Sequence, residues 1–182
     1  MSTSTFTCQN ICEIDSQYPD QTNTGSCDCG YYTGKVNNCF FNFPQIYGTI
    51  PAGALINSAT LKLEQVSGGY NATENMDITV RFGSWYVMTW NNQAPQASGS
   101  PTVDVSLTGS GAGIRSFDLK SIVQWLVDNQ NTSHIIKLAR DPNTASGTLD
   151  AKRFSTTAGD HSLEVDWTPR TAARFMARAA EL

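Results

Sequence analysis

Five cysteines are the residues of this sequence best suited to chemistry, and all lie in its first 39 residues: Cys8, Cys12, Cys27, Cys29 and Cys39. Zinc sites usually pair cysteines as Cys-x2-Cys or add histidines. Here the spacings are Cys-x3-Cys and Cys-x-Cys, and both histidines lie far along the chain. We therefore expect two disulfides, with buried thiols as one alternative and zinc as a weaker one. A fifth cysteine would stay free or bond to a neighbouring subunit.

Few other residues are suited to catalysis. A nucleophilic site needs a nucleophile, a base and an orienting group. The two histidines, His134 and His161, lie at a strand start and in the turn "AGDHS", outside any hydrolase motif. We expect both to be solvated, and we expect a protein with no catalytic residues and no cofactor. Loop oxygens of Asp141, Asn143 and Asp160 could hold Ca²⁺, although ordinary turn acids explain them better.

The composition excludes some classes of partner. The net charge is −4, charged residues make up 15% of the chain, and its first 150 residues contain no basic cluster that would bind nucleic acid. No apolar run reaches the roughly 18 residues of a membrane span. The start, "MSTSTFTCQN", lacks the basic and apolar parts of a secretory signal, so we expect synthesis in a cytoplasm unless a signal was removed.

The stretch "SWYVMTWNNQAP" (residues 84–95) places aromatic rings beside amides, and it has two interpretations. In the first, Trp90 and Trp125 are core residues at one edge of a β-sandwich, and the amides pair with loop backbone groups. Trp90→Ala would then collapse the fold. In the second, flat rings form a sugar-binding platform, made by Trp85 and Tyr86 or by Tyr31 and Tyr32.

The elements that would position these residues are mostly strands. Apolar residues alternate with polar ones in "SATLKLEQV", "MDITVRF" and "TVDVSL", and residues 39–43 and three later segments also read as strands. Residues 17–30 read as a long loop. Leu119, Ile122 and Leu126 have helical spacing, with Asp118 as the N-cap. About eight strands and one short crossing helix predict an all-β, antiparallel, jelly-roll-like sandwich.

The last residues differ in composition. Pro169 follows Thr168 and precedes an alanine-rich run, which predicts a helix over residues 169–182. Its arginines and apolar residues repeat at helical spacing, and the expected docking residues are Arg170, Arg174, Phe175, Met176 and Arg178. Because an isolated helix of this length is marginal in water, it must dock on its own sandwich or on a neighbouring subunit.

The order of "IPAGALINSATLKLEQV", "TWNNQAP", "SFDLKSIVQWL", "NTSHIIKLAR" and "SLEVDW" resembles the DNRLRE domain family. The resemblance implies a jelly-roll sandwich related to disaggregatase-type carbohydrate-binding modules. The resemblance covers residues 40–168, and both ends lie outside its pattern. We therefore divide the chain into a Cys-rich strand and loop that joins the sandwich (1–38), a sandwich core (39–168) and a docking helix (169–182).

These features lead us to expect a non-enzymatic structural protein of a virus-like or bacteriophage particle, present in the virion. It would decorate or cross-link the capsid, or form part of a neck or tail, with capsid or tail proteins and itself as partners. The alternatives are a carbohydrate-binding module that binds a glycan and a subunit of a cell-surface fibre, either of them secreted or on the cell surface.

Overall fold

Alternating residues build the strands of the computed structural model, which describes residues 1–182 apart from 82–87, 94, 130–134, 143–146 and 171–182. In β5 (Leu55–Gln65) every second side chain from Ala59 onward is buried. In β6 (Glu74–Arg81) the predicted apolar set of Met76, Ile78 and Val80 is buried in the same way. The period-two pattern therefore marks the inward face of each strand.

The described part of the chain contains eleven strands and two α-helices. The strands are β1 (Ser2–Thr7), β2 (Asn10–Asp15), β3 (Asp28–Tyr32), β4 (Lys35–Asn42), β5, β6, β7 (Val103–Leu107), β8 (Gly113–Asp118), β9 (Ile135–Arg140), β10 (Lys152–Arg153) and β11 (Ser162–Thr168). The helices are α1 (Ile46–Thr49) and α2 (Lys120–Asp128), and a 3-10 turn covers Ala158–Asp160. None of these helices is long and apolar enough to cross a membrane.

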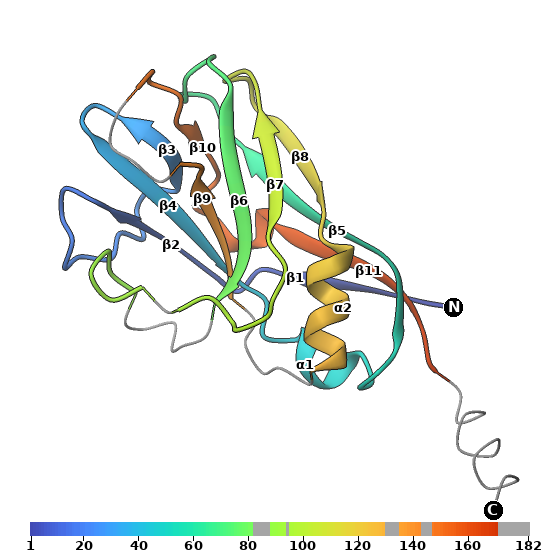
Figure 1. Ribbon diagram of the computed structural model, residues 1–182. Helices are drawn as coiled ribbons and strands as arrows, with labels where there is room; N and C mark the ends of the chain where they lie inside the picture. Colours follow the sequence, from blue (N-terminus) through green and yellow to red (C-terminus); the bar gives the residue numbers. More distant parts are fainter. Residues whose placement is uncertain (82–87, 94, 130–134, 143–146, 171–182) are drawn as a thin grey trace, which may run out of the picture.

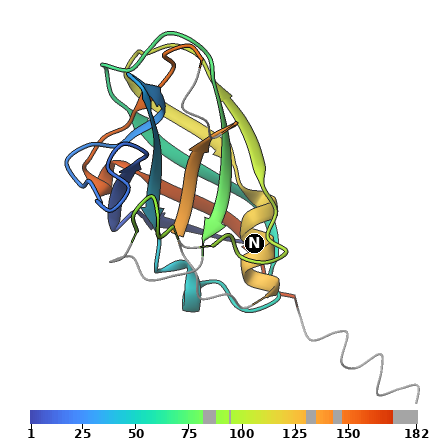
Figure 2. The same ribbon diagram turned by 60° about the vertical axis from the view of Figure 1, so that its left-hand side comes forward.

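The strands form two antiparallel sheets that face each other (Figures 1 and 2). One sheet has the order β1-β11-β5-β8, and the other has the order β10-β3-β4-β9-β6-β7, with β2 paired to β4. The protein is therefore an all-β antiparallel sandwich, as the sequence pattern predicts. Helix α2 follows β8 of the first sheet and leads to β9 of the second, which makes it the predicted crossing helix.

The main core lies between the sheets, and a smaller apolar cluster lies on the outer face of the larger sheet. Successive residues of β4 show the division: Phe41 belongs to the main core, whereas Phe40 belongs to the outer cluster. The outer cluster also contains Cys12, Ile14, Met88 and Ile135. The larger sheet is thus buried on both faces where β2, β4 and β9 meet.

The predicted N-cap of α2, Asp118, is one residue too early, because the N-cap position is held by Leu119. The backbone N–H of Lys120 donates to the Asp118 carboxylate at 2.8 Å, so this side chain binds the first turn although the helix starts two residues later. The Gln124 amide then joins the helix to β5: it accepts from the Ile56 N–H at 2.8 Å and donates to the Ala54 carbonyl at 3.0 Å. The helix is fixed at the edge of the sandwich by these bonds and by its buried apolar face.

The amino-terminal segment contains more strands than its sequence predicts. Three strands, β1 to β3, precede β4, and β3 begins inside the expected loop of residues 17–30. Polar partners explain β1, where the Thr3 hydroxyl donates to Asp166 at 2.6 Å and the Trp167 indole donates to Ser4 at 3.1 Å. A polar edge strand of this kind depends on its neighbour, so periodicity alone does not identify it.

Candidate functional site

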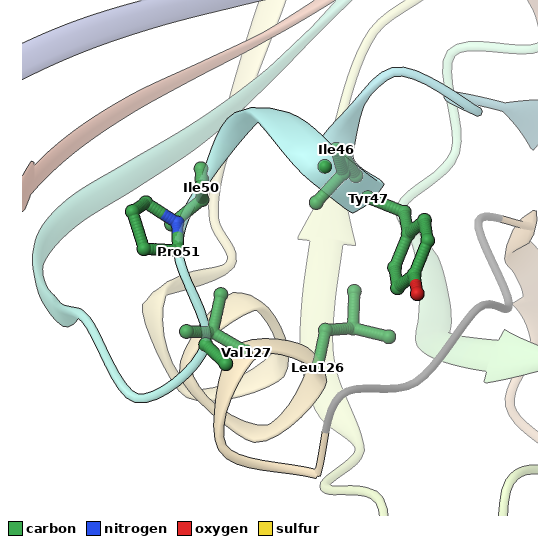
Figure 3. A pocket seen from close by; sticks show the side chains of 8 residues that line it. Ile46, Tyr47, Ile50, Pro51, Leu126 and Val127 are labelled. Atoms are coloured by element: carbon green, nitrogen blue, oxygen red, sulfur yellow. The ribbon is translucent and has the colours of Figure 1, made fainter.

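An apolar pocket of about 250 Å³ opens between the α1 segment and the end of α2 (Figure 3). Ile46, Ile50 and Pro51 face Leu126 and Val127 across it. The remaining lining residues are Tyr47, Gly48 and Ala52. With this lining the pocket can take an apolar side chain but offers few groups that would orient a polar ligand.

The local sequence explains why this pocket forms. Gly48 has a φ of 83°, which breaks the helical run after Tyr47 and turns the chain towards Pro51. As a result Tyr47 projects from the surface with 58% of its side chain exposed, while Ile46 and Ile50 stay buried. Residues 46–52 and the end of α2 thereby enclose the apolar pocket between them.

The described chain ends beside this pocket. A guanidinium nitrogen of Arg170 lies 3.7 Å from the carboxylate of Asp128, the residue that follows Val127. Both side chains are well exposed, so the pair adds little stability. The pair shows where the described part of the chain ends: Arg170 lies beside the end of α2, next to the pocket residue Val127. Of the expected docking residues, Arg174, Phe175, Met176 and Arg178 lie outside the described residues.

A second, polar pocket of about 280 Å³ lies where residues 15–23 fold over β2 and β4. Asp15 accepts from the backbone N–H groups of Gln17 and Tyr18, both at 2.8 Å, and from the Lys35 ammonium at 2.9 Å. The Tyr18 ring is 52% exposed at the rim. The full lining is Glu13, Asp15, Tyr18, Gln21, Thr22, Asn23 and Lys35.

A buried ionic cluster joins β6, β9 and the segment that leads into β10. The Arg140 guanidinium lies 3.1 Å from Asp150 and 3.6 Å from Glu74, and the Lys152 ammonium donates to the carbonyls of Tyr70 and Ala72. Burial, followed by the nearby Asp150 carboxyl, raises the pKa of Glu74 to about 9. Glu74 is 1% exposed and Lys152 is fully buried, so these groups contact protein rather than solutes.

The "TWNNQAP" loop covers the outer cluster of the larger sheet. Trp90 is half-buried and packs against that cluster rather than against the main core. Gln93 donates to the Trp90 carbonyl at 3.1 Å and accepts from the Lys137 ammonium at 2.6 Å. Asn91 donates to Asp20 at 2.9 Å, which joins the loop to residues 15–23. The side-chain amides of Asn91 and Gln93 thus form hydrogen bonds within the protein.

The other aromatic candidates are placed separately. Trp125 on α2 is half-buried and packs against the main core. Tyr31 lies under the Arg140 guanidinium at 5.4 Å, and Tyr32 packs against Tyr70 with ring centroids 5.7 Å apart. Both tyrosine rings therefore have partners inside the protein. Trp85 and Tyr86 lie outside the described residues.

His161 is buried, which corrects the expectation of a solvated turn histidine. Its Nδ1 accepts from the Glu64 N–H at 3.1 Å, its Nε2 donates to the Ser155 carbonyl at 3.0 Å, and its ring meets Phe41 edge-on at 5.1 Å. Desolvation lowers its pKa. The turn sequence predicts the backbone correctly, but the side chain points back between the sheets. His134 lies outside the described residues.

All five cysteines are thiols in the structure, and all are buried. The least buried is Cys8, with 3% exposure, so no thiol lies at the surface to bond to a neighbour. Burial raises the pKa of Cys8 and of Cys12 to about 12, which keeps these thiols protonated and unreactive. The expected pairing of cysteines into two disulfides stays a prediction.

Metal-binding groups are sparse in the described part of the chain, where no three His, Cys, Asp or Glu side chains come together. Of the residues suggested for Ca²⁺, Asp160 accepts from the Ser155 hydroxyl at 2.5 Å, Asp141 is exposed, and Asn143 lies outside the described residues. We do not place a cation with these residues.

Comparisons with known proteins add little. No protein-family model matches the chain, and no curated protein matches it. Among solved structures, one similar chain is an exo-β-1,3-galactanase from Phanerochaete chrysosporium with bound β-1,3-galactotriose. The similarity has a TM-score of 0.34 and 12% identity, and it covers 90% of this chain but only 29% of that chain. We base no functional argument on so distant a likeness, and membership of the DNRLRE family stays a prediction.

Proposed function

We propose that this protein is a non-enzymatic structural subunit of a larger assembly, held there by contacts between its sandwich and the carboxyl-terminal segment of a neighbouring copy. The observation that carries the proposal is the apolar pocket between α1 and α2, which lies beside the end of the described chain. The setting that fits best is a virus-like or bacteriophage particle, in the capsid, neck or tail.

The pocket and the carboxyl-terminal segment are chemically complementary. The pocket offers buried aliphatic side chains such as Leu126 and Val127, and residues 171–182 include Phe175 and Met176. An aromatic side chain buries on the order of 200 Å² when it enters such a site. Since the pocket and the segment are different surfaces of one chain, each copy can contact two others. Heterologous contacts of this kind build rings or open chains, as shells and tails require.

The surface supports a role in assembly. Only 15% of residues are charged, and Thr3, Ser58 and Asn75 are examples of uncharged polar residues at exposed strand positions. In the Thr3–Asp166–Ser58 set, two hydroxyls donate to one carboxylate at 2.6 and 3.0 Å. Such faces form hydrogen bonds with a partner without the desolvation cost of many charges.

A truncation experiment tests the proposal. The chain ending at Pro169 should keep its circular dichroism spectrum and its cooperative unfolding, but it should lose self-association in analytical ultracentrifugation and incorporation into particles. Ala52→Glu should have the same effect in the full chain, because it places a charge at an exposed position of the pocket. The matched control is Ala112→Glu, since Ala112 is also exposed but lies in the loop between β7 and β8.

Two results would refute this function. One is a truncated chain that self-associates and incorporates as well as the full chain. The other is equal loss of assembly in Ala52→Glu and Ala112→Glu, which would mean that added charge, rather than the pocket, is responsible.

A second candidate function is glycan binding, and the polar pocket favours it. An exposed ring at the rim, Tyr18, lies beside hydrogen-bonding groups of Gln21, Asn23 and Lys35, a combination that suits the faces and hydroxyls of a sugar. A glycan array probed with purified monomer tests it. Binding that Tyr18→Ala abolishes would support this function, whereas an array without signal would leave the assembly role alone.

A further inference from the structure

Two of the five cysteines lie in direct contact. The Sγ atoms of Cys27 and Cys39 are 3.0 Å apart, and both side chains are fully buried. Carbon atoms in ordinary non-bonded contact are about 3.5–4.0 Å apart, and sulfur is larger than carbon. Cys27 directly precedes β3 and Cys39 lies in β4, and the antiparallel pairing of these two strands brings the side chains together.

The other three cysteines have different surroundings. Cys8 Sγ contacts the Asn10 carbonyl at 3.2 Å, and Cys29 Sγ contacts the Leu138 carbonyl at 3.5 Å. Cys12 lies in the outer cluster, on the opposite face of the larger sheet from Cys39. Among the contacts of these five described residues, the one between Cys27 and Cys39 joins two sulfur atoms.

We propose that Cys27 and Cys39 form the single disulfide of this fold when the chain folds in the presence of a disulfide oxidant such as oxidised glutathione. One S–S bond forms between the two residues as the S–S bond of the oxidant breaks. The two thiols lose two electrons and two protons, which the oxidant takes up to become two glutathione thiols. The proposal is independent of the assembly function.

The timing of this reaction follows from burial. Thiol–disulfide exchange needs a thiolate that the oxidant can reach. In the folded protein neither sulfur is exposed, and burial, together with the adjacent Cys27 sulfur, raises the pKa of Cys39 well above its usual range. The bond should therefore form while β3 and β4 come together and only slowly once the core has closed.

The bond would fix the amino-terminal part of the sandwich. Its two ends are 12 residues apart in the chain, and it would join the start of β3 to the middle of β4. Strand β4 also pairs with β2 and β9, so it is central to the larger sheet. A cross-link at this position resists separation of the β3–β4 hairpin without changing the surface.

The test is oxidative refolding followed by thiol counting and peptide mapping. The reduced chain has five thiols, so the product refolded with oxidised and reduced glutathione should have three in denaturant, five less the two in the bond. Trypsin together with a protease that cuts before aspartate isolates Cys27 in residues 20–27 and Cys39 in residues 36–62. Mass spectrometry should find these two peptides linked.

Matched variants make the result specific. Cys39→Ser should show all of its four remaining thiols after the same treatment, whereas Cys12→Ser should show two. The oxidised protein should melt about 5–10 °C above its reduced form. Five thiols in the refolded wild type, or a linked pair other than residues 20–27 with 36–62, would overturn the proposal. The peptide map of the wild type does not depend on any variant, and a circular dichroism spectrum of each refolded variant shows whether it has folded before its thiols are counted.

Discussion

The imidazole of His161 accepts a hydrogen bond from the backbone N–H of Glu64, with 3.1 Å between Nδ1 and the nitrogen. The bond joins the start of β11 to β5 inside the sandwich, and it requires the neutral tautomer with its proton on Nε2, which the Ser155 carbonyl accepts at 3.0 Å. Both ring nitrogens are thus occupied by backbone groups. The histidine is a structural residue whose protonation would break one of these bonds.

We predict that His161 makes the protein less stable in acid. Its pKa in the folded state lies below the ordinary value of 6.5, so the unfolded chain takes up the proton first. The stability is present above that pH and is lost as the pH falls from about 6.5 through the lower, folded-state pKa. His161→Gln should cost about 1–3 kcal/mol near neutral pH by leaving the Glu64 N–H unpaired. Urea unfolding between about pH 8 and 5 should show this difference shrink; a constant difference would contradict the assignment.

Glu74 should make stability depend on pH in the opposite direction to His161. Its folded-state pKa of about 9 lies above the ordinary value of 4.5, so the folded protein holds the proton more tightly than the unfolded chain. Its contribution to stability is complete below about pH 4.5 and is lost as the pH rises towards 9. Glu74→Gln removes the titration and keeps the shape. We expect the free energy of unfolding of this variant to rise relative to that of the wild type by up to about 1.4 kcal/mol per pH unit over that range. The measurement is urea unfolding of both proteins across this pH range. A difference in unfolding free energy that does not change with pH would refute the prediction.

The spacing of apolar residues predicts those helices and strands whose structure depends on their own residues rather than on distant partners. Helix α2 and strands β5 and β6 follow from apolar spacing, because burial of one face fixes both the element and its direction. The N-terminal strand β1 cannot be predicted from apolar spacing, because its hydroxyls pair with Asp166 and Trp167, which are distant in sequence.

The candidate site depends almost wholly on tertiary packing. The apolar pocket joins residues of the α1 segment to Leu126 and Val127, and no local pattern connects these two parts of the chain. A turn at Pro51 can be predicted, but its position against α2 cannot. The same holds for His161, whose turn is recognisable in "AGDHS" although the burial of its ring depends on β5 and Phe41.

The two glycines of the β3–β4 hairpin should respond differently to alanine. Both have positive φ, 122° at Gly30 and 87° at Gly34, so either substitution strains the backbone by about 1 kcal/mol. At Gly30 the new Cβ would also lie 2.7 Å from the Ala151 Cα and 2.7 Å from a Glu74 carboxylate oxygen, whereas nothing lies within 4 Å at Gly34. Gly30→Ala should therefore cost at least about 3 kcal/mol and Gly34→Ala about 1 kcal/mol in urea unfolding. Similar costs would mean that the hairpin moves away from Ala151.

Trp90→Ala tests what the "TWNNQAP" loop does. Because the ring is half-buried over the outer cluster of Cys12, Phe40 and Met88, its loss should lower the free energy of unfolding by about 2 kcal/mol and leave the main core intact. That outcome is milder than the collapse predicted from the sequence for Trp90 as a core residue at one edge of the sandwich, because the ring packs on the outer cluster instead. The measurement is urea unfolding followed by circular dichroism, with Trp90→Phe as the control that keeps an aromatic ring and should recover about half of the loss. An unfolded Trp90→Ala protein would show that the outer cluster is needed for folding, and an unchanged stability would show that the ring is free for a ligand.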